Sequence, residues 1–103
     1  MHTIESIKRA NKAAGHFFFE PASMRFFASR VGSFVVEGPG GVYFVTSEQF
    51  RPSHGTPAPR RYSVRKFEPE TGHVNEGSEF QAFASLSGAK RAAQRMADGT
   101  GRP

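Results

Sequence analysis

The sequence contains no cysteine and no tryptophan. A chain without cysteine has no disulfide scaffold, no thiolate metal ligand and no cysteine nucleophile. No apolar run approaches the ~18 residues that a membrane-spanning helix needs. The N-terminal segment MHTIESIKRANKAAG is too polar to supply the apolar core of a secretory signal. These absences predict a cytoplasmic protein that has no membrane partner.

Motifs that mark catalytic and metal sites are missing as well. No serine lies in a Gly-x-Ser-x-Gly elbow, and the glycine-rich GPGG at 38–41 matches neither a phosphate-binding loop nor a dinucleotide fingerprint. No histidine pairs with another histidine or with a carboxylate at the spacing of zinc ligands. We therefore expect a protein that is not an enzyme and that holds no cofactor and no metal. An enzyme with an unrecognised active site is kept as an alternative. The histidines are His2, His16, His54 and His73.

Phenylalanine and arginine are abundant in the sequence. The 103 residues include 11 Phe, and Lys and Arg outnumber Asp and Glu by 14 to 9, which gives a formal net charge of +5. Most of the basic residues are arginines, whose planar guanidinium binds two oxygens of a phosphate or carboxylate at once. A chain of this length forms one domain, which we place at 1–97, followed by a short flexible tail at 98–103. The charge predicts an anionic partner.

Caps, apolar periodicity and turn residues together predict an α+β fold. Thr3 and Gly15 bound an N-terminal helix, and Ser85 and Gly99 bound a C-terminal helix. Hairpins pair their strands in antiparallel fashion. We therefore expect a four- to five-stranded antiparallel sheet with the N-terminal and C-terminal helices packed on one face. The elements expected in between are a buried strand at 16–20, a short helix at 21–28, a hairpin around 38–41, an irregular loop at 51–60, a strand at 61–67 and an edge strand at 73–80.

The stretch GHFFFEPASMRFFASR, residues 15–30, raises the question of whether its phenylalanines form core or surface. A sheet under two helices needs several large apolar side chains, and burial of one Phe contributes about 1.5–3 kcal/mol. Phe18 and Phe26 lie off the apolar face of their neighbours and are the candidates for exposure. An exposed aromatic side chain beside an arginine can anchor a partner protein. The candidates for the core are Phe17, Phe19, Phe27, Phe34, Phe44 and Phe67.

Lys90, Arg91 and Arg95 lie on the polar side of the C-terminal helix, and the other clustered basic residues fall in two parts of the sequence. One part is the strand at 60–66, where Arg61 and Arg65 should point outward, opposite to the apolar side chains between them. The other surrounds Phe26 in the short helix. Proteins that bind nucleic acids combine cationic grooves with aromatic platforms, but the signature of RNA-recognition sheets is missing here. The predicted partner-binding residues are Arg25, Phe26, Arg30, Arg60, Arg61, Arg65 and Lys66.

Four segments resemble a family of small proteins encoded by bacteriophages and prophages. They are NKAAGHFFFEPASMRFFASR, VYFVTSEQF, RRYSVR and EFQAFASLSGAKRAA, and the resemblance spans residues 4–97. Its most specific part is MRFFASR followed by YFVTSEQF. The family has no established activity, so the resemblance implies no catalytic or binding residue. It implies a setting, namely an accessory gene of a mobile element whose product works in the cytoplasm of a bacterial host.

Small phage proteins without catalytic motifs often bind host machinery stoichiometrically, as anti-CRISPR proteins and other anti-defence inhibitors do. The resemblance therefore implies a non-enzymatic inhibitor that docks on a host protein or nucleoprotein complex, with a CRISPR effector as the leading candidate. Direct contact with RNA or DNA is part of this hypothesis. The net charge of +5 argues against an acidic mimic of DNA. A free DNA- or RNA-binding protein of a phage is the second hypothesis.

Overall fold

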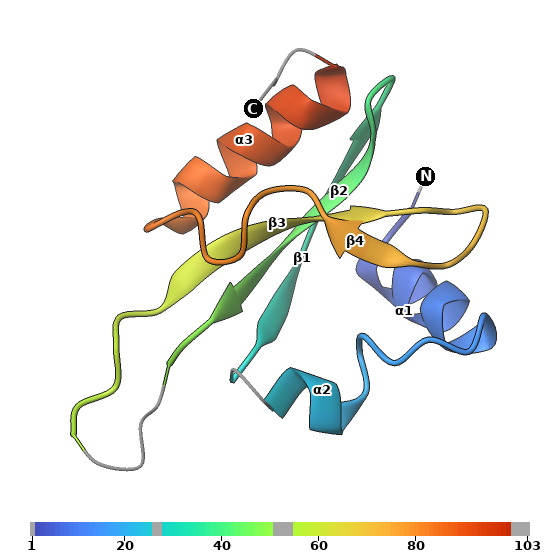
Figure 1. The fold of residues 1–103 in the computed structure, drawn as a ribbon. Helices are drawn as coiled ribbons and strands as arrows, with labels where there is room; N and C mark the ends of the chain where they lie inside the picture. The colour runs from blue at the N-terminus through green and yellow to red at the C-terminus, as the bar shows by residue number, and fades with distance from the viewer. Residues whose placement is uncertain (1, 26–27, 51–54, 100–103) are drawn as a thin grey trace.

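The computed structural model describes residues 2–25, 28–50 and 55–99 (Figure 1). The described strands form one antiparallel sheet in the order β1-β2-β3-β4, which is also their order along the chain. The prediction of an α+β fold with an antiparallel sheet between terminal helices is confirmed, with four strands in the sheet. The elements are α1 (Ile4–Ala13), α2 (Pro21–Arg25), β1 (Arg30–Gly38), β2 (Gly41–Glu48), β3 (Arg61–Phe67), β4 (Val74–Glu76) and α3 (Leu86–Asp98).

The terminal helices pack on opposite faces of the sheet, so the prediction that they share one face is wrong (Figure 1). Val42 and Phe44 of β2 pack with the isoleucines of α1, whereas Tyr43 and Val45 pack with the alanines of α3. Successive side chains of a strand point to opposite sides. Because β2 is covered on both sides, it is buried without interruption from Val42 to Glu48.

Side-chain caps explain where the two terminal helices begin and end. The Thr3 hydroxyl accepts a hydrogen bond from the Ser6 N–H at 3.1 Å, and the Ser6 hydroxyl accepts one from the Thr3 N–H at 2.9 Å. This reciprocal pair satisfies two N–H groups that a helix start otherwise leaves unbonded. The Ser85 hydroxyl accepts from the Gly88 N–H at 3.1 Å, and Gly99 caps α3 with a φ of 81°. The helix boundaries predicted from Thr3, Ser85 and Gly99 are confirmed.

The turn between β1 and β2 lies directly against the C-terminal part of α3. The Gly40 N–H donates to the Ala97 carbonyl oxygen at 2.7 Å. A Cβ atom on Gly40 would collide with the Met96 carbonyl oxygen, so this close approach of two backbones requires glycine. Small side chains on the helix make the approach feasible. The buried residues of α3 are Ala89, Ala92, Ala93 and Ala97.

The segment 16–20 forms a turn and not the predicted buried strand. Phe18 and Phe19 both pack on Phe44, with ring centroids 6.2 and 5.9 Å apart. A strand would send these two neighbours to opposite faces, whereas the turn lets both reach one core. Phe17 is 71% exposed, so its assignment to the core is wrong. Phe18 packs partly buried against the core, so its predicted exposure is wrong as well. Phe44 and Phe67 are buried as predicted, Phe19 and Phe34 pack partly buried against the core, and Phe26 and Phe27 lie outside the described residues.

The predicted edge strand at 73–80 and the predicted short helix at 21–28 are both present but shorter, since β4 ends at Glu76 and Ala28 is not helical. β4 pairs with β3 as a three-residue edge strand, and 55–60 forms no helix or strand. Residues 51–54 of the predicted loop and 100–103 of the predicted tail lie outside the described residues, and α3 continues to Asp98. Within the described part of the chain, every helix is too short or too polar to cross a lipid bilayer.

Candidate functional site

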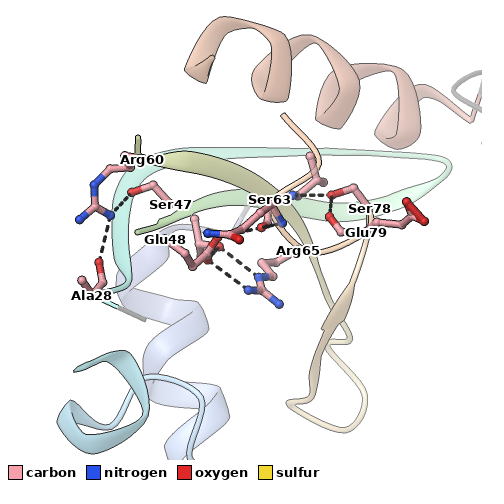
Figure 2. Close-up of polar contacts among 11 residues, drawn as sticks. Ala28, Ser47, Glu48, Arg60, Ser63, Arg65, Ser78 and Glu79 are labelled. Carbon is pink, nitrogen blue, oxygen red and sulfur yellow. Dashed lines mark hydrogen bonds and ion pairs between the residues drawn. The ribbon is translucent and has the colours of Figure 1, made fainter. Parts of the chain in front are cut away.

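Four polar side chains of β2 and β3 form a hydrogen-bonded cluster around Glu48, called here the Glu48 cluster (Figure 2). The Glu48 carboxylate is 0% exposed and accepts hydrogen bonds from Thr46 Oγ1 at 2.6 Å, Ser63 Oγ at 2.8 Å and Arg65 Nη2 at 3.1 Å. The strand register pairs Thr46 with Ser63. Residues two apart on a strand share a face, so all four side chains lie on the side of the sheet that α1 covers. Both carboxylate oxygens therefore have donors, which a buried charge requires.

Arg65 lies against two phenylalanine rings and is largely buried, so the prediction that it points outward into solvent is wrong. Its Cζ atom lies 5.3 Å from the Phe18 ring centroid and 5.6 Å from the Phe80 ring centroid. Its Nε donates to Thr46 Oγ1 at 3.1 Å, and its side chain is 13% exposed. The prediction assumed an open outer face of β3. The turn that carries Phe18 and the segment that carries Phe80 cover that face.

A cavity of about 390 Å³ lies beside Arg65, called here the phenylalanine cavity. Ligand clefts in proteins measure about 300–1,000 Å³, so this cavity is large enough for one small planar group. Two of its rings face solvent in part, since Phe17 is 71% exposed and Phe80 is 37% exposed. The lining residues are Phe17, Phe18, Ser23, Met24, Ser29, Arg65 and Phe80.

Two exposed arginines adjoin the phenylalanine cavity in sequence. Arg25 follows the lining residue Met24, and Arg30 follows the lining residue Ser29. Neither arginine makes an ion pair with a described residue. An exposed guanidinium without a carboxylate partner keeps its charge available for an incoming anion. Phe26, which was predicted to bind a partner together with them, lies outside the described residues.

Arg60 ties the connection between α2 and β1 to the sheet (Figure 2). Its Nη1 donates to the Ala28 carbonyl oxygen and to the Ser47 hydroxyl, both at 2.9 Å. Ala28 has a φ of 48°, in the left-handed region that residues with a Cβ seldom adopt. Since Ala28 precedes Ser29, the guanidinium of Arg60 helps to position one wall of the phenylalanine cavity. A direct contact of Arg60 with a partner stays a prediction.

Arg61 and Lys66 are also held by contacts within the chain. Arg61 donates from Nε to the Gln81 carbonyl oxygen at 2.8 Å and thereby fastens the segment before α3 to the sheet. Lys66 Nζ lies 3.7 Å from a carboxylate oxygen of Glu68 and 5.9 Å from the ring centroid of Tyr43. Among the predicted partner-binding residues that are described, Arg25 and Arg30 therefore have the most freely available charge. Their binding to a partner stays a prediction.

Sequence reasoning missed the Glu48 cluster and the exposed ring of Phe80. The signal was the placement of polar residues at same-face positions of two paired strands, Thr46 and Glu48 on one and Ser63 and Arg65 on the other. Recognising it required the register of β2 against β3, which the sequence alone did not give.

The described histidines form one close pair and no metal site. The rings of His16 and His73 lie with centroids 3.8 Å apart, and His16 Nε2 lies 3.1 Å from the Thr71 carbonyl oxygen. Within the described residues, no group of three or more His, Cys, Asp or Glu side chains is arranged to hold a metal ion. His54 is outside the described residues.

A separate contact joins the N-terminus to the sheet. The His2 N–H donates to Glu37 Oε1 at 2.7 Å, and His2 Nδ1 lies 3.1 Å from Glu37 Oε2. The backbone hydrogen bond, and next the contact with the imidazole, hold the pKa of Glu37 below its ordinary value, because they stabilise the charged carboxylate. Glu37 lies at the opposite end of β1 from Arg30, so this contact is remote from the phenylalanine cavity.

Comparisons with known proteins give a family but no activity. A family model described as "Family of unknown function (DUF7447)" matches residues 3–94. No curated protein and no solved structure matches the chain.

Proposed function

The chain belongs to DUF7447, a family of unknown function, and we propose that it binds single-stranded nucleic acid stoichiometrically and without catalysis. The observation that carries the proposal is the phenylalanine cavity together with Arg25 and Arg30, which follow two of its lining residues in the sequence. Both arginines are exposed and make no ion pair with a described residue. In this proposal an unpaired base enters the cavity and stacks on its rings. The adjacent phosphates bind the two arginines.

The ring composition of the cavity supports the recognition of unpaired bases. Single-stranded nucleic acids bind to aromatic side chains by stacking, which contributes about 1–3 kcal/mol per base. Phe17 and Phe80 present partly exposed rings at the cavity, and the inner ring of Phe18 is held in place against Arg65. A base within a duplex is already stacked on its neighbours and is not free to enter such a cavity.

The charge distribution supports an anionic ligand. The formal net charge is +5, and arginine binds phosphate through two parallel N–H groups. Most other basic side chains near β3 are engaged within the fold, but Arg25 and Arg30 are exposed and lack carboxylate partners among the described residues. They therefore place positive charge where the backbone of a bound strand would pass.

The chemistry of the lining supports binding in preference to catalysis. Among the described residues that line the cavity are hydroxyls and one guanidinium, but no imidazole and no carboxylate. The nearest carboxylate, that of Glu48, is buried and accepts hydrogen bonds from Thr46, Ser63 and Arg65. A general base needs access to the proton that it removes, and Glu48 has none.

The biological setting in this proposal follows from the resemblance to small phage-encoded proteins. We propose that the bound strand is part of a host nucleoprotein complex, with a CRISPR effector as the leading candidate, and that occupancy of the strand inhibits the complex. A basic protein of this kind would act by covering nucleic acid, in contrast to an acidic inhibitor that imitates it.

Fluorescence anisotropy with labelled single-stranded DNA, single-stranded RNA and duplex DNA tests the binding proposal. We expect single strands to bind more tightly than the duplex, with a log–log salt slope of about 0.7 per phosphate contacted. The double variant Arg25→Gln/Arg30→Gln should lower the slope by about 1.4. The matched control Arg9→Gln/Arg91→Gln removes the same charge from exposed positions of α1 and α3 and should change the slope less. Absence of binding to any single strand at about 50 mM salt would overturn the proposal.

Capture from a bacterial lysate tests the proposed setting. A tagged wild-type protein should retain one nucleoprotein effector, and nuclease treatment of the lysate should release it. The Arg25→Gln/Arg30→Gln variant should retain less of the effector than the Arg9→Gln/Arg91→Gln control. Retention that survives nuclease and is equal for both variants would instead indicate a protein surface as the ligand.

A further inference from the structure

Arg65 has one edge of its guanidinium left for a ligand. Its Cζ atom lies 5.3 Å from the ring centroid of Phe18 and 5.6 Å from that of Phe80. Its Nε and Nη2 donate to Thr46 and Glu48. Its Nη1 makes no hydrogen bond with a described residue, and Arg65 lines the phenylalanine cavity. The end of the guanidinium carries one N–H of Nη1 and the second N–H of Nη2. These two groups can therefore donate parallel hydrogen bonds to a ligand in the cavity.

The charge state of the Glu48 cluster selects the kind of group that this donor can bind. The positive charge of Arg65 is already balanced by the buried carboxylate of Glu48 at 3.1 Å. A phosphate or carboxylate in the cavity would lie close to that carboxylate and would be repelled by it. A neutral group with two adjacent acceptor atoms meets the donor without this repulsion.

Resting on the proposed binding of single-stranded nucleic acid, we propose that the phenylalanine cavity selects guanine and that Arg65 reads it. Guanine presents O6 and N7 as adjacent acceptors, and a bidentate arginine contact to this edge is the commonest specific contact in protein–DNA recognition. A base bound in this way lies in the plane of the guanidinium. The rings of Phe18 and Phe80, which lie close to the guanidinium, can then contact the base as well.

The other bases fit the donor less well. Adenine offers N7 beside an amino donor, which would face the N–H groups of Arg65. Thymine and uracil place an N–H between their carbonyl oxygens. Cytosine carries two adjacent acceptors, O2 and N3, but its single ring covers less of the phenyl faces than a purine does. The negative charge of the strand stays outside the cavity, where Arg25 and Arg30 are exposed.

Short strands that differ in one base test the proposal without changing the protein. The probes are oligothymidylates of about eight nucleotides with a single central dG, dA or dC, or with thymidine throughout, measured by anisotropy at one salt concentration. We expect the dG strand to bind about tenfold more tightly than the all-thymidine strand, as one good bidentate contact implies. Replacing guanine by 7-deazaguanine, which lacks the N7 acceptor, should abolish most of this advantage.

A protein variant tests whether the preference arises in the cavity. Phe17 is 71% exposed, so Phe17→Ala should leave the fold intact and still reduce the affinity for the dG strand. Phe50, which is 58% exposed and does not line the cavity, offers the matched control Phe50→Ala. Arg65→Lys keeps the charge but loses the planar fork, and it should remove the preference for guanine if circular dichroism shows that it folds.

The outcomes separate this inference from the proposed function. Tight binding of the dG strand that falls with 7-deazaguanine and with Phe17→Ala supports both. Equal affinity for all four strands, or a preference for dC, overturns guanine selection and leaves the binding of single strands in place. Absence of binding to every strand overturns the proposed function and this inference with it.

Discussion

The buried ion pair between Arg65 and Glu48 gives a prediction whose size follows from the structure. Replacing Arg65 with methionine removes the positive charge but keeps an unbranched side chain that packs against aromatic rings. The loss of contacts with Phe18 and Phe80 is therefore small. Glu48, which is 0% exposed, keeps the hydroxyl donors of Thr46 and Ser63 but loses its charged partner.

Removal of one partner from a buried ion pair costs about 3–5 kcal/mol. The Arg65 side chain is 13% exposed and lines the phenylalanine cavity, so water can reach the place it vacates. This places the expected loss for Arg65→Met at about 3 kcal/mol, near the lower limit. Because domains are stable by only about 5–15 kcal/mol, the loss is a large share of the total.

A second variant separates the ion pair from its surroundings. Glu48→Gln preserves the shape of the side chain and leaves the guanidinium of Arg65 partly exposed, so we expect a smaller loss of about 1–2 kcal/mol. In the double variant Glu48→Gln/Arg65→Met no buried charge is left without a partner. Its loss should therefore be smaller than the sum of the single losses by about 1–3 kcal/mol.

Urea denaturation followed by circular dichroism measures these free energies, provided that the dependence on denaturant stays the same among the variants. Lys66→Met is the matched control, because Lys66 neighbours Arg65 but its ion pair is exposed. Its Nζ lies 3.7 Å from Glu68 Oε2, and the two side chains are 36% and 35% exposed. Its loss should stay below about 1 kcal/mol. A loss for Arg65→Met no larger than that for Lys66→Met would refute a stabilising ion pair. A loss for the double variant equal to the sum of the two single losses would refute it as well.

Three further predictions concern other contacts. Gly40→Ala should destabilise the fold by about 1–3 kcal/mol in thermal unfolding, because the new Cβ meets the Met96 carbonyl oxygen; an unchanged melting temperature would contradict the close approach of α3. Ala28→Gly should stabilise the fold by up to about 1 kcal/mol in urea denaturation, because glycine adopts the φ of 48° without steric cost. A lower stability of the variant would contradict the left-handed backbone conformation at residue 28. The lowered pKa of Glu37 contributes stability that is fully present above the unfolded-state pKa of the carboxyl and is lost as the pH falls through the lower folded-state pKa. Glu37→Gln should therefore flatten the decline of stability in the acid range below about pH 4.5, and identical pH profiles for variant and wild type would argue against the hydrogen bonds from His2.

Local signals predicted the elements of the fold well, and long-range contacts decided what was missed. The hydroxyls of Thr3 and Ser85 and the left-handed Gly99 act within a few residues, so the helix ends could be found from the sequence. The side on which each helix packs depends on which face of the sheet still needs cover. The two-sided apolar pattern of β2 contained that information, since a strand buried on both faces requires a layer on each side.

The candidate site was predicted only in part, because its residues come from segments far apart in the chain. Arg25 and Arg30 were identified from their charge beside aromatic residues, and both are exposed. Arg65 was identified too, but its partner Glu48 and its covering ring Phe80 were not. Which carboxylate meets a given arginine depends on strand register and on the path of the covering segments, and neither has a local signature.

The agreement between strand order and chain order also bears on how the protein folds. Each strand pairs with the next strand along the chain. Because closure entropy grows slowly with loop length, the sheet can form early. The phenylalanine cavity, in contrast, brings together Phe17 and Phe80, which are separated along the chain by all four strands. It can be completed only when the segments before β1 and before α3 have both docked. We therefore expect refolding chains to gain strand signal first and affinity for a ligand last, and a nascent chain to acquire its binding surface only after Phe80 has left the ribosome.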